Sequence, residues 1–184
     1  MSIYLRNIIR FILLVLIQVL LLNDIPLQWW SSPGGIPPYT PFIYPLFILL
    51  IPLSTPTSFL LLLAFLTGIT IDSFMDTGGI HAASCVLMAF VRRRVLATLL
   101  PKRLSEYQNI APNIKSMGWT PFLTYAGVLL AIHHTTYYII EIWGFQSVGY
   151  LLLKIAISLL TSMVFVALYS LLFSSSINTA YYDK

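Results

Sequence analysis

The chain has 184 residues, of which 58% are hydrophobic and only 9% are charged. Soluble domains carry about 25% charged residues, so this chain has too little polar surface to coat a water-soluble globule. The composition therefore excludes a soluble enzyme or binding domain and predicts a single polytopic membrane domain over residues 1–184. The formal net charge is +4, but the basic residues gather in two short regions, which argues against a nucleic-acid surface.

The apolar segments predict an all-α membrane protein. A spanning helix needs roughly 20 mainly apolar residues. Five segments satisfy this, and a sixth, 37–53, is weaker because three prolines interrupt it. The residues alone leave 37–53 as a short tilted span or a re-entrant loop. With it included, we expect a bundle of six transmembrane helices at about 3–23, 37–53, 57–75, 80–98, 121–141 and 148–173.

The distribution of basic residues predicts the orientation. Cytoplasmic ends of membrane segments are rich in Lys and Arg, so Arg6 and Arg10 place the N-terminus inside. The loop 92–120 is the second basic region, and both regions face the cytoplasm only if an even number of crossings separates them. This condition favours a crossing at 37–53 and puts both termini in the cytoplasm. The basic loop residues are Arg92, Arg93, Arg94, Lys102, Arg103 and Lys115.

This loop has two interpretations. It is a solvated cytoplasmic loop, or it is a docking site for a cytoplasmic partner. In either case we expect Arg92, Arg93 and Arg94 to extend from the inner edge of helix 80–98 toward the membrane surface, as long basic side chains do at helix ends.

The passage 57–91 carries the clearest functional signal. Asp72 and Asp76 end one apolar helix, and Gly79 and His81 open the next. An ionisable group inside a membrane persists only with a partner, so it marks a candidate site. Gly68, Asp72 and Asp76 are spaced by four residues and share one helical face, and the glycine permits close approach of a neighbouring helix.

Two partners are available to Asp72. The helix that starts near Gly79 offers free backbone N–H groups, which bind anions well. Lys154 lies at a similar depth in the last helix. We therefore expect Asp72 to tie the hairpin 57–98 to helix 148–173, with a hydrated carboxylate at a helix end as the alternative.

The proposed topology places nearly all ionisable residues of the membrane interior in its outer half. We expect a polar cluster on that side that contacts a partner. Its members are Asp72, Asp76, His81, His133, His134, Glu141 and Lys154.

Catalytic and metal signatures are weak. His133 and His134 are adjacent, so they diverge by about 100° on a helix and cannot face one ligand; we expect one inside the bundle and one at the membrane interface. Asp72 and Asp76 alone are too few for a hard cation, which takes about six oxygens. We expect no enzyme, no cofactor and no metal. A lipid-processing enzyme that uses Asp72, Asp76 and His81 is the weakest alternative.

One stretch resembles a known family. Gly68-Ile69-Thr70-Ile71-Asp72-Ser73-Phe74, followed by Gly79-Ile80-His81-Ala82-Ala83 and an apolar helix that ends at Arg92, resembles the rod-shape-determining protein MreD family. The small size, the arginine-bearing first helix and the basic loop agree with this. The layout covers the whole chain, whereas the motif covers about residues 57–95.

The resemblance implies a fold and a function. The fold would be similar to the six-helix substrate-binding subunits of energy-coupling-factor vitamin transporters. The function would be non-enzymatic: an inner-membrane component of the bacterial elongation complex that scaffolds MreC, whose bulk is periplasmic. Further partners would be MreB, RodA and its transpeptidase. Membrane lipid is a further partner that we expect from the basic loop rather than from the resemblance. Gly68, Asp72 and Gly79 would be packing and hairpin-shaping residues. The alternative function is a vitamin-binding transporter subunit, which requires an outward cavity.

Overall fold

The computed structural model describes residues 3–23, 40–100, 106–107, 110–142 and 148–173, and in this part the regular structure is entirely helical. Four of the six predicted helices are confirmed as continuous α-helices, and a fifth, 3–23, ends in a π-helical turn. The elements in chain order are α1 (Ile3–Ile17), η1 (Gln18–Leu22), α2 (Leu46–Leu49), α3 (Thr57–Met75), α4 (Ile80–Leu99), α5 (Ile114–Met117), α6 (Trp119–Ile142) and α7 (Val148–Phe173).

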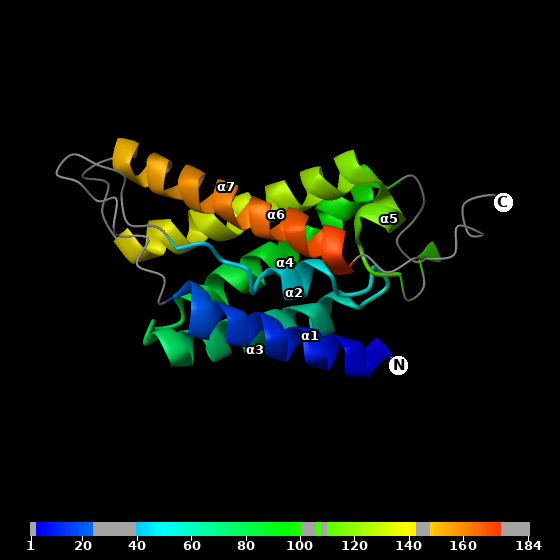
Figure 1. The fold of residues 1–184 in the computed structure, drawn as a ribbon, viewed down its shortest axis with the longest axis horizontal. Helices are drawn as coiled ribbons and strands as arrows, with labels where there is room; N and C mark the ends of the chain where they lie inside the picture. The colour runs from blue at the N-terminus through cyan, green and yellow to red at the C-terminus, as the bar shows by residue number, and fades with distance from the viewer. Residues whose placement is uncertain (1–2, 24–39, 101–105, 108–109, 143–147, 174–184) are drawn as a thin grey trace.

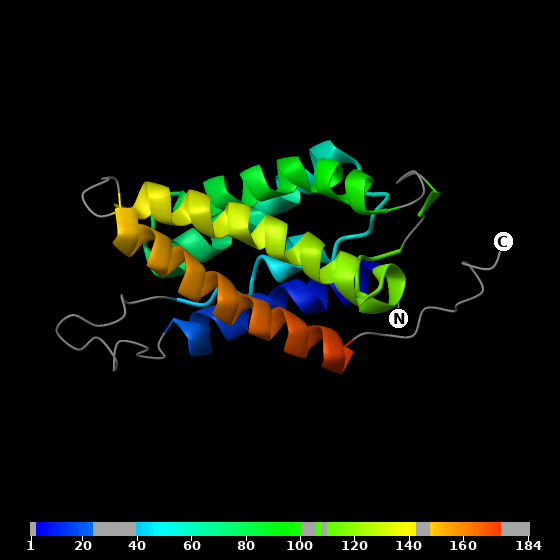
Figure 2. The ribbon, with the colours of Figure 1, turned by 90° about the horizontal axis from the view of Figure 1, so that it is seen from above.

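The long helices lie side by side along one axis (Figures 1 and 2). α3 packs on α4, α4 on α6, and α6 on α7, so these four form a curved wall. α1 closes the open side, where Arg10 Nε donates a hydrogen bond of 3.0 Å to the Tyr169 hydroxyl of α7. The core of the bundle therefore lies between this wall and α1.

The bundle has two distinct ends. α1 begins, α4 ends, α6 begins and α7 ends at the right of Figure 1, which we call the basic end. α3 turns into α4 at the opposite end, together with the end of α6 and the start of α7; we call this the hairpin end. The start of α1 and the end of α4, which carry the two basic regions, thus lie at the same end.

The outer surfaces of several helices are apolar. Large exposed apolar side chains cover α1, η1, α3 and α7, including Leu20 of η1, Leu62 of α3 and Leu160 of α7. Within the described residues, three helices are long and apolar enough to cross a membrane: Leu5–Leu22, Thr57–Met75 and Val148–Leu172. The chain thus has the character of a membrane protein. α4 and α6 differ from these helices in carrying four buried arginine and histidine side chains: Arg92, His81, His133 and His134.

Residues 40–53 correct the predicted helix over 37–53, of which 37–39 lie outside the described residues. Only Leu46–Leu49 form a helical turn, and the chain on either side is non-helical. Pro41, Pro45 and Pro52 explain this, because proline lacks the N–H donor and disfavours the helical conformation of the residue before it. We call residues 40–53 the inner segment. It runs from the hairpin end toward the basic end between the long helices (cyan in Figure 1), and residues 41–51 are all buried.

Candidate functional site

Asp72 joins α3 to the first turn of α4. Its Oδ1 accepts hydrogen bonds from the Thr77 hydroxyl at 2.7 Å and the His81 N–H at 3.0 Å, and its Oδ2 accepts one from the Ala82 N–H at 2.9 Å. The carboxylate is 5% exposed. The predicted capture by free N–H groups at the start of the next helix is confirmed, because a carboxylate there satisfies donors that have no partner within the helix.

Two glycines shape this hairpin. A Cβ on Gly68 would lie 2.3 Å from the Ala82 Cα atom, so only glycine allows α3 and α4 to approach this closely. Gly79 has a φ of 91° and precedes α4, and the turn also holds Asp76 in the left-handed region at φ 54°. Asp76 itself is exposed and makes the turn without entering the interior.

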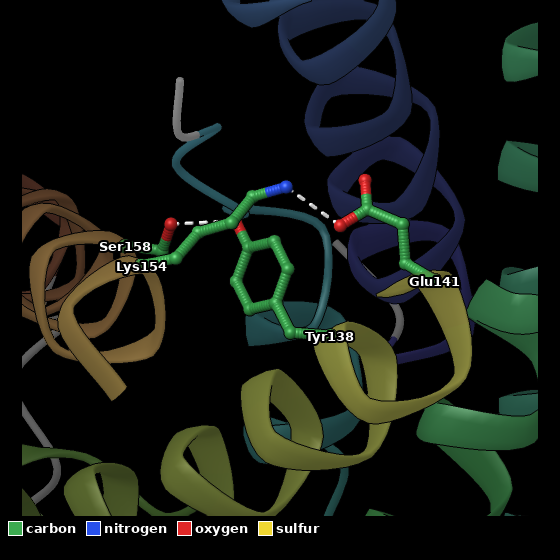
Figure 3. A network of polar contacts seen from close by, with 4 residues as sticks. All are labelled: Tyr138, Glu141, Lys154 and Ser158. Carbon is green, nitrogen blue, oxygen red and sulfur yellow. Dashed lines mark hydrogen bonds and ion pairs between the residues drawn. The ribbon is translucent and has the colours of Figure 1, made fainter. Parts of the chain in front are cut away.

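Lys154 does not pair with Asp72, and that part of the hypothesis is wrong. Its Nζ lies 2.7 Å from Glu141 Oε2 and 4.7 Å from the centre of the Tyr138 ring (Figure 3). The Tyr138 hydroxyl lies 2.6 Å from Ser158 Oγ. These contacts join α7 to α6, its neighbour in the sequence, and Lys154 therefore does not tie α7 to the hairpin.

Both histidines of the His133-His134 pair are buried, which corrects the expectation that one faces the membrane interface. They do diverge, as the helical geometry predicts. His133 Nε2 lies 2.7 Å from the Tyr44 hydroxyl, which also lies 2.7 Å from His81 Nδ1. His134 Nε2 contacts Ser162 Oγ at 3.1 Å, and its Nδ1 contacts the Leu130 carbonyl oxygen at 2.7 Å.

The ring of Phe42 fills the space between these side chains. Its centroid lies between 4.8 and 6.2 Å from five neighbouring rings, which come from α4 and α6. Most of these contacts are edge-to-face, a favoured geometry of aromatic pairs. We call this group the aromatic cluster; its members are Phe42, Tyr44, His81, His133, His134, Tyr137 and Tyr138.

Side chains of distant helices satisfy the backbone of the inner segment near the hairpin end. Gln18 Nε2 donates to the Pro41 carbonyl at 3.2 Å, and Gln18 Oε1 accepts from the Ile43 N–H at 2.9 Å. Ser162 Oγ accepts from the Phe42 N–H at 2.9 Å. Non-helical backbone at membrane depth is tolerated only where protein groups replace water in this way.

The same arrangement continues toward the basic end. The Tyr125 hydroxyl donates to the Leu49 carbonyl at 2.8 Å, Arg10 Nη1 donates to the Leu50 carbonyl at 3.4 Å, and Arg92 donates to the Ile51 carbonyl. Arg92 Nε also donates to the Tyr125 hydroxyl at 2.8 Å. Three consecutive carbonyl groups therefore have three side-chain donors from α1, α4 and α6.

Arg92 corrects a further expectation. It is only 2% exposed and points into the bundle, whereas Arg93 and Arg94 are exposed, as expected for the end of α4. Lys115 is exposed in α5, and Lys102 and Arg103 lie outside the described residues.

Several buried polar side chains thus bond to the backbone of the inner segment and to members of the aromatic cluster. Within the described part of the chain, no group of three or more His, Cys, Asp or Glu side chains could hold a metal ion. The sequence interpretation missed Gln18, Tyr44, Tyr125 and Ser162. Gln18 had a visible signal, because it is a lone amide within an apolar run; a tyrosine or serine in such a run has no comparable signal.

Comparisons of the chain with protein-family models, curated proteins and solved structures found no match.

Proposed function

We propose that this chain is a multi-pass protein of the bacterial inner membrane, similar to MreD, that scaffolds an MreC-like periplasmic protein in the cell-elongation complex. The observation that supports this best is that the protein's own backbone and side chains fill the interior of the bundle. Buried polar side chains bind the chain's own backbone between α1 and α7, and the ring of Phe42 fills the centre of the aromatic cluster. A molecule built this way presents a rigid outer surface to a partner.

The competing function is a vitamin-binding transporter subunit. Such a subunit needs a cavity among the histidines and tyrosines near the hairpin end. Phe42 and Tyr44 occupy that position, and both side chains are buried by at least 99%. The inner segment would have to move out of this position before a small molecule could bind among these histidines and tyrosines.

The hairpin end is the surface that we propose for the MreC-like partner. Phe74 is 62% exposed at the last turn of α3, next to the exposed Asp76. Glu141 adds a second exposed carboxylate at the end of α6. In the proposed orientation these groups lie on the periplasmic side, where the exposed Phe74 ring and the nearby Asp76 carboxylate fit a membrane-proximal segment with apolar and basic side chains.

The basic end would then face the cytoplasm. Arg93, Arg94 and Lys115 are exposed there. This surface is available to MreB, to RodA and its transpeptidase within the same complex, and to anionic lipid.

The test is affinity capture of the tagged full-length chain from cross-linked membranes, with the recovered proteins identified by mass spectrometry. We expect an MreC-like protein from the wild type and strongly reduced recovery from a variant with Phe74→Ala and Asp76→Lys. Phe65→Ala is the matched control, because Phe65 is a similarly exposed ring in the middle of α3.

Two outcomes would contradict the proposal. One is capture of transporter ATPase subunits with a bound vitamin in the extract. The other is equal recovery of the MreC-like protein from the hairpin-end variant, which would reject the assigned surface.

A further inference from the structure

Arg92 is a buried cation that has no anionic partner among the residues that the structure describes. Its hydrogen bonds go to the Tyr125 hydroxyl and the Ile51 carbonyl, which are both neutral. The ion pair found among the described residues joins Lys154 to Glu141, which lie at the other end of the bundle from Arg92. Removing a charge from water without an opposite charge is costly, so a negative group near Arg92 would be strongly favoured.

A small cavity adjoins Arg92. It has a volume of about 120 Å³ and is lined by Arg92, Arg93 and residues 53–57, together with Leu60 and Leu96. One water molecule requires only about 10–15 Å³ on this scale, so the space admits a larger polar group. α3 begins at Thr57 without a side-chain cap. The positive end of the helix dipole and the first N–H groups of α3 therefore add to the charge of the two arginines.

A larger apolar furrow continues from this cavity. It has a volume of about 520 Å³, lies between α1 and α3, and shares Ser54, Thr55 and Pro56 with the small cavity. Its size falls in the range of about 300–1,000 Å³ that is typical of ligand sites. Apolar side chains from both helices and the inner segment line it: Ile8, Phe11, Phe47, Phe59, Leu63 and Leu66.

We propose that these two spaces form one binding site for an anionic phospholipid. The phosphate group would lie in the small cavity beside Arg92 and Arg93, and an acyl chain would lie in the furrow between α1 and α3. A basic pocket joined to an apolar groove matches the two parts of this molecule. The site lies at the basic end, which in the proposed orientation meets the leaflet rich in anionic lipid.

The lipid would act as a structural ligand. It supplies the missing negative charge next to Arg92, and the chain fills the gap beside the inner segment. The proposal requires a membrane but no protein partner, so it stands or fails independently of the MreC-like interaction.

Native mass spectrometry of the delipidated full-length chain, titrated with dioleoylphosphatidylglycerol, tests the headgroup contact. We expect one tightly bound lipid, with a dissociation constant that rises about fivefold in Arg93→Gln. Arg94→Gln is the matched control, because Arg94 is also exposed but its guanidinium lies over the Phe90 ring at 5.6 Å. We expect no change there. Equal affinity in both variants would overturn the headgroup assignment.

The acyl chain is tested by a second matched pair. Leu66→Trp places a large ring in the furrow, whereas Leu62→Trp places the same ring on the outer face of α3; the two leucines are 47% and 52% exposed. We expect weaker lipid binding only in Leu66→Trp. Equal binding by both variants would overturn the furrow as the chain site.

Two further probes separate the possible ligands. Inorganic phosphate should not compete with the lipid at millimolar concentration, because the furrow supplies much of the affinity. Full competition would replace the lipid with a free-phosphate site and overturn the proposal. Equal binding of dioleoylphosphatidylcholine would show that charge is not recognised and would overturn it as well.

Discussion

The α3–α4 hairpin and the inner segment differ in where their buried polar groups find hydrogen-bond partners. In the hairpin, Asp72 binds N–H groups only 9 and 10 residues further along the chain. In the inner segment, Ile43 and Phe42 depend on side chains 25 and 120 residues away. Both regions contain polar groups that an apolar environment penalises, but one is satisfied by its neighbour in sequence and the other by the whole bundle.

This difference has a consequence for stability. The hairpin concentrates its tightest packing at Gly68, so an added side chain there forces α3 and α4 apart. The inner segment distributes its hydrogen bonds over several helices, so each loss leaves one or two backbone groups unsatisfied while the others remain. We therefore expect abrupt effects in the hairpin and graded, largely additive effects along the inner segment.

The largest effect is expected for Gly68→Ala. The new methyl group would meet the α4 backbone at 2.3 Å, and backbone cannot move aside as a flexible side chain can. We expect a loss of about 3 kcal/mol or more and little folded protein in detergent, measured by size-exclusion chromatography. Gly127→Ala is the control, because its nearest neighbour would be the flexible end of Met163 at 3.8 Å. A stable Gly68→Ala protein would show that the helices can separate without penalty.

Gln18→Leu tests the inner segment. The substitution keeps the approximate size but leaves the Pro41 carbonyl and the Ile43 N–H without their partner. At about 1–3 kcal/mol for each unsatisfied group, we expect a loss near 3 kcal/mol, measured by denaturation in mixed micelles. Ser73→Ala is the control, since this exposed hydroxyl bonds only within its own helix. Unchanged stability of Gln18→Leu would mean that the inner segment is not held by these bonds.

Asp72→Asn sharpens the comparison within the hairpin. The amide offers one acceptor oxygen in place of two and turns an NH₂ group toward backbone donors. We expect a loss of about 2 kcal/mol by the same denaturation assay. Asp76→Asn should change little, because Asp76 is exposed and asparagine tolerates the left-handed conformation. Equal effects at both positions would refute the special role of Asp72.

The smallest effect is expected for Lys154→Met. The ion pair with Glu141 is partly exposed, with side chains 12% and 34% accessible, and such pairs contribute at most about 1 kcal/mol. The methionine retains the apolar stem over Tyr138 but loses the cation–π contact. We expect a shift of the melting temperature by only a few degrees. A collapse of the fold would assign Lys154 the central role that the structure gives to Asp72.

Sequence reasoning succeeded where the relevant partner is near in the chain. Hydropathy located the long helices. The four-residue spacing of Gly68 and Asp72, together with the free N–H groups expected at the helix start after Gly79, predicted a close hairpin with a captured carboxylate. These inferences use only helical geometry and the free donors of a helix start, which are local properties.

It failed where the partner is remote. Arg92 was expected at the surface because three arginines in sequence resemble a helix end, and nothing local indicates that one of them bonds to Ile51. The prolines of 40–53 argued against a helix, but they do not reveal which side chains replace its hydrogen bonds. Lys154 was assigned to Asp72 by depth alone, although Glu141 lies closer.

The hydrogen bond from the Phe42 N–H to Ser162 also bears on biogenesis. During synthesis, the N-terminal third of this protein would emerge long before α7 exists. In the proposed membrane setting, the part of the inner segment around Phe42 would therefore settle only after translation of α7, and until then would depend on water, the insertion machinery or a chaperone. A ribosome stalled before α7 should leave a nascent chain that membrane proteases attack within this stretch, and release of the finished chain should protect it.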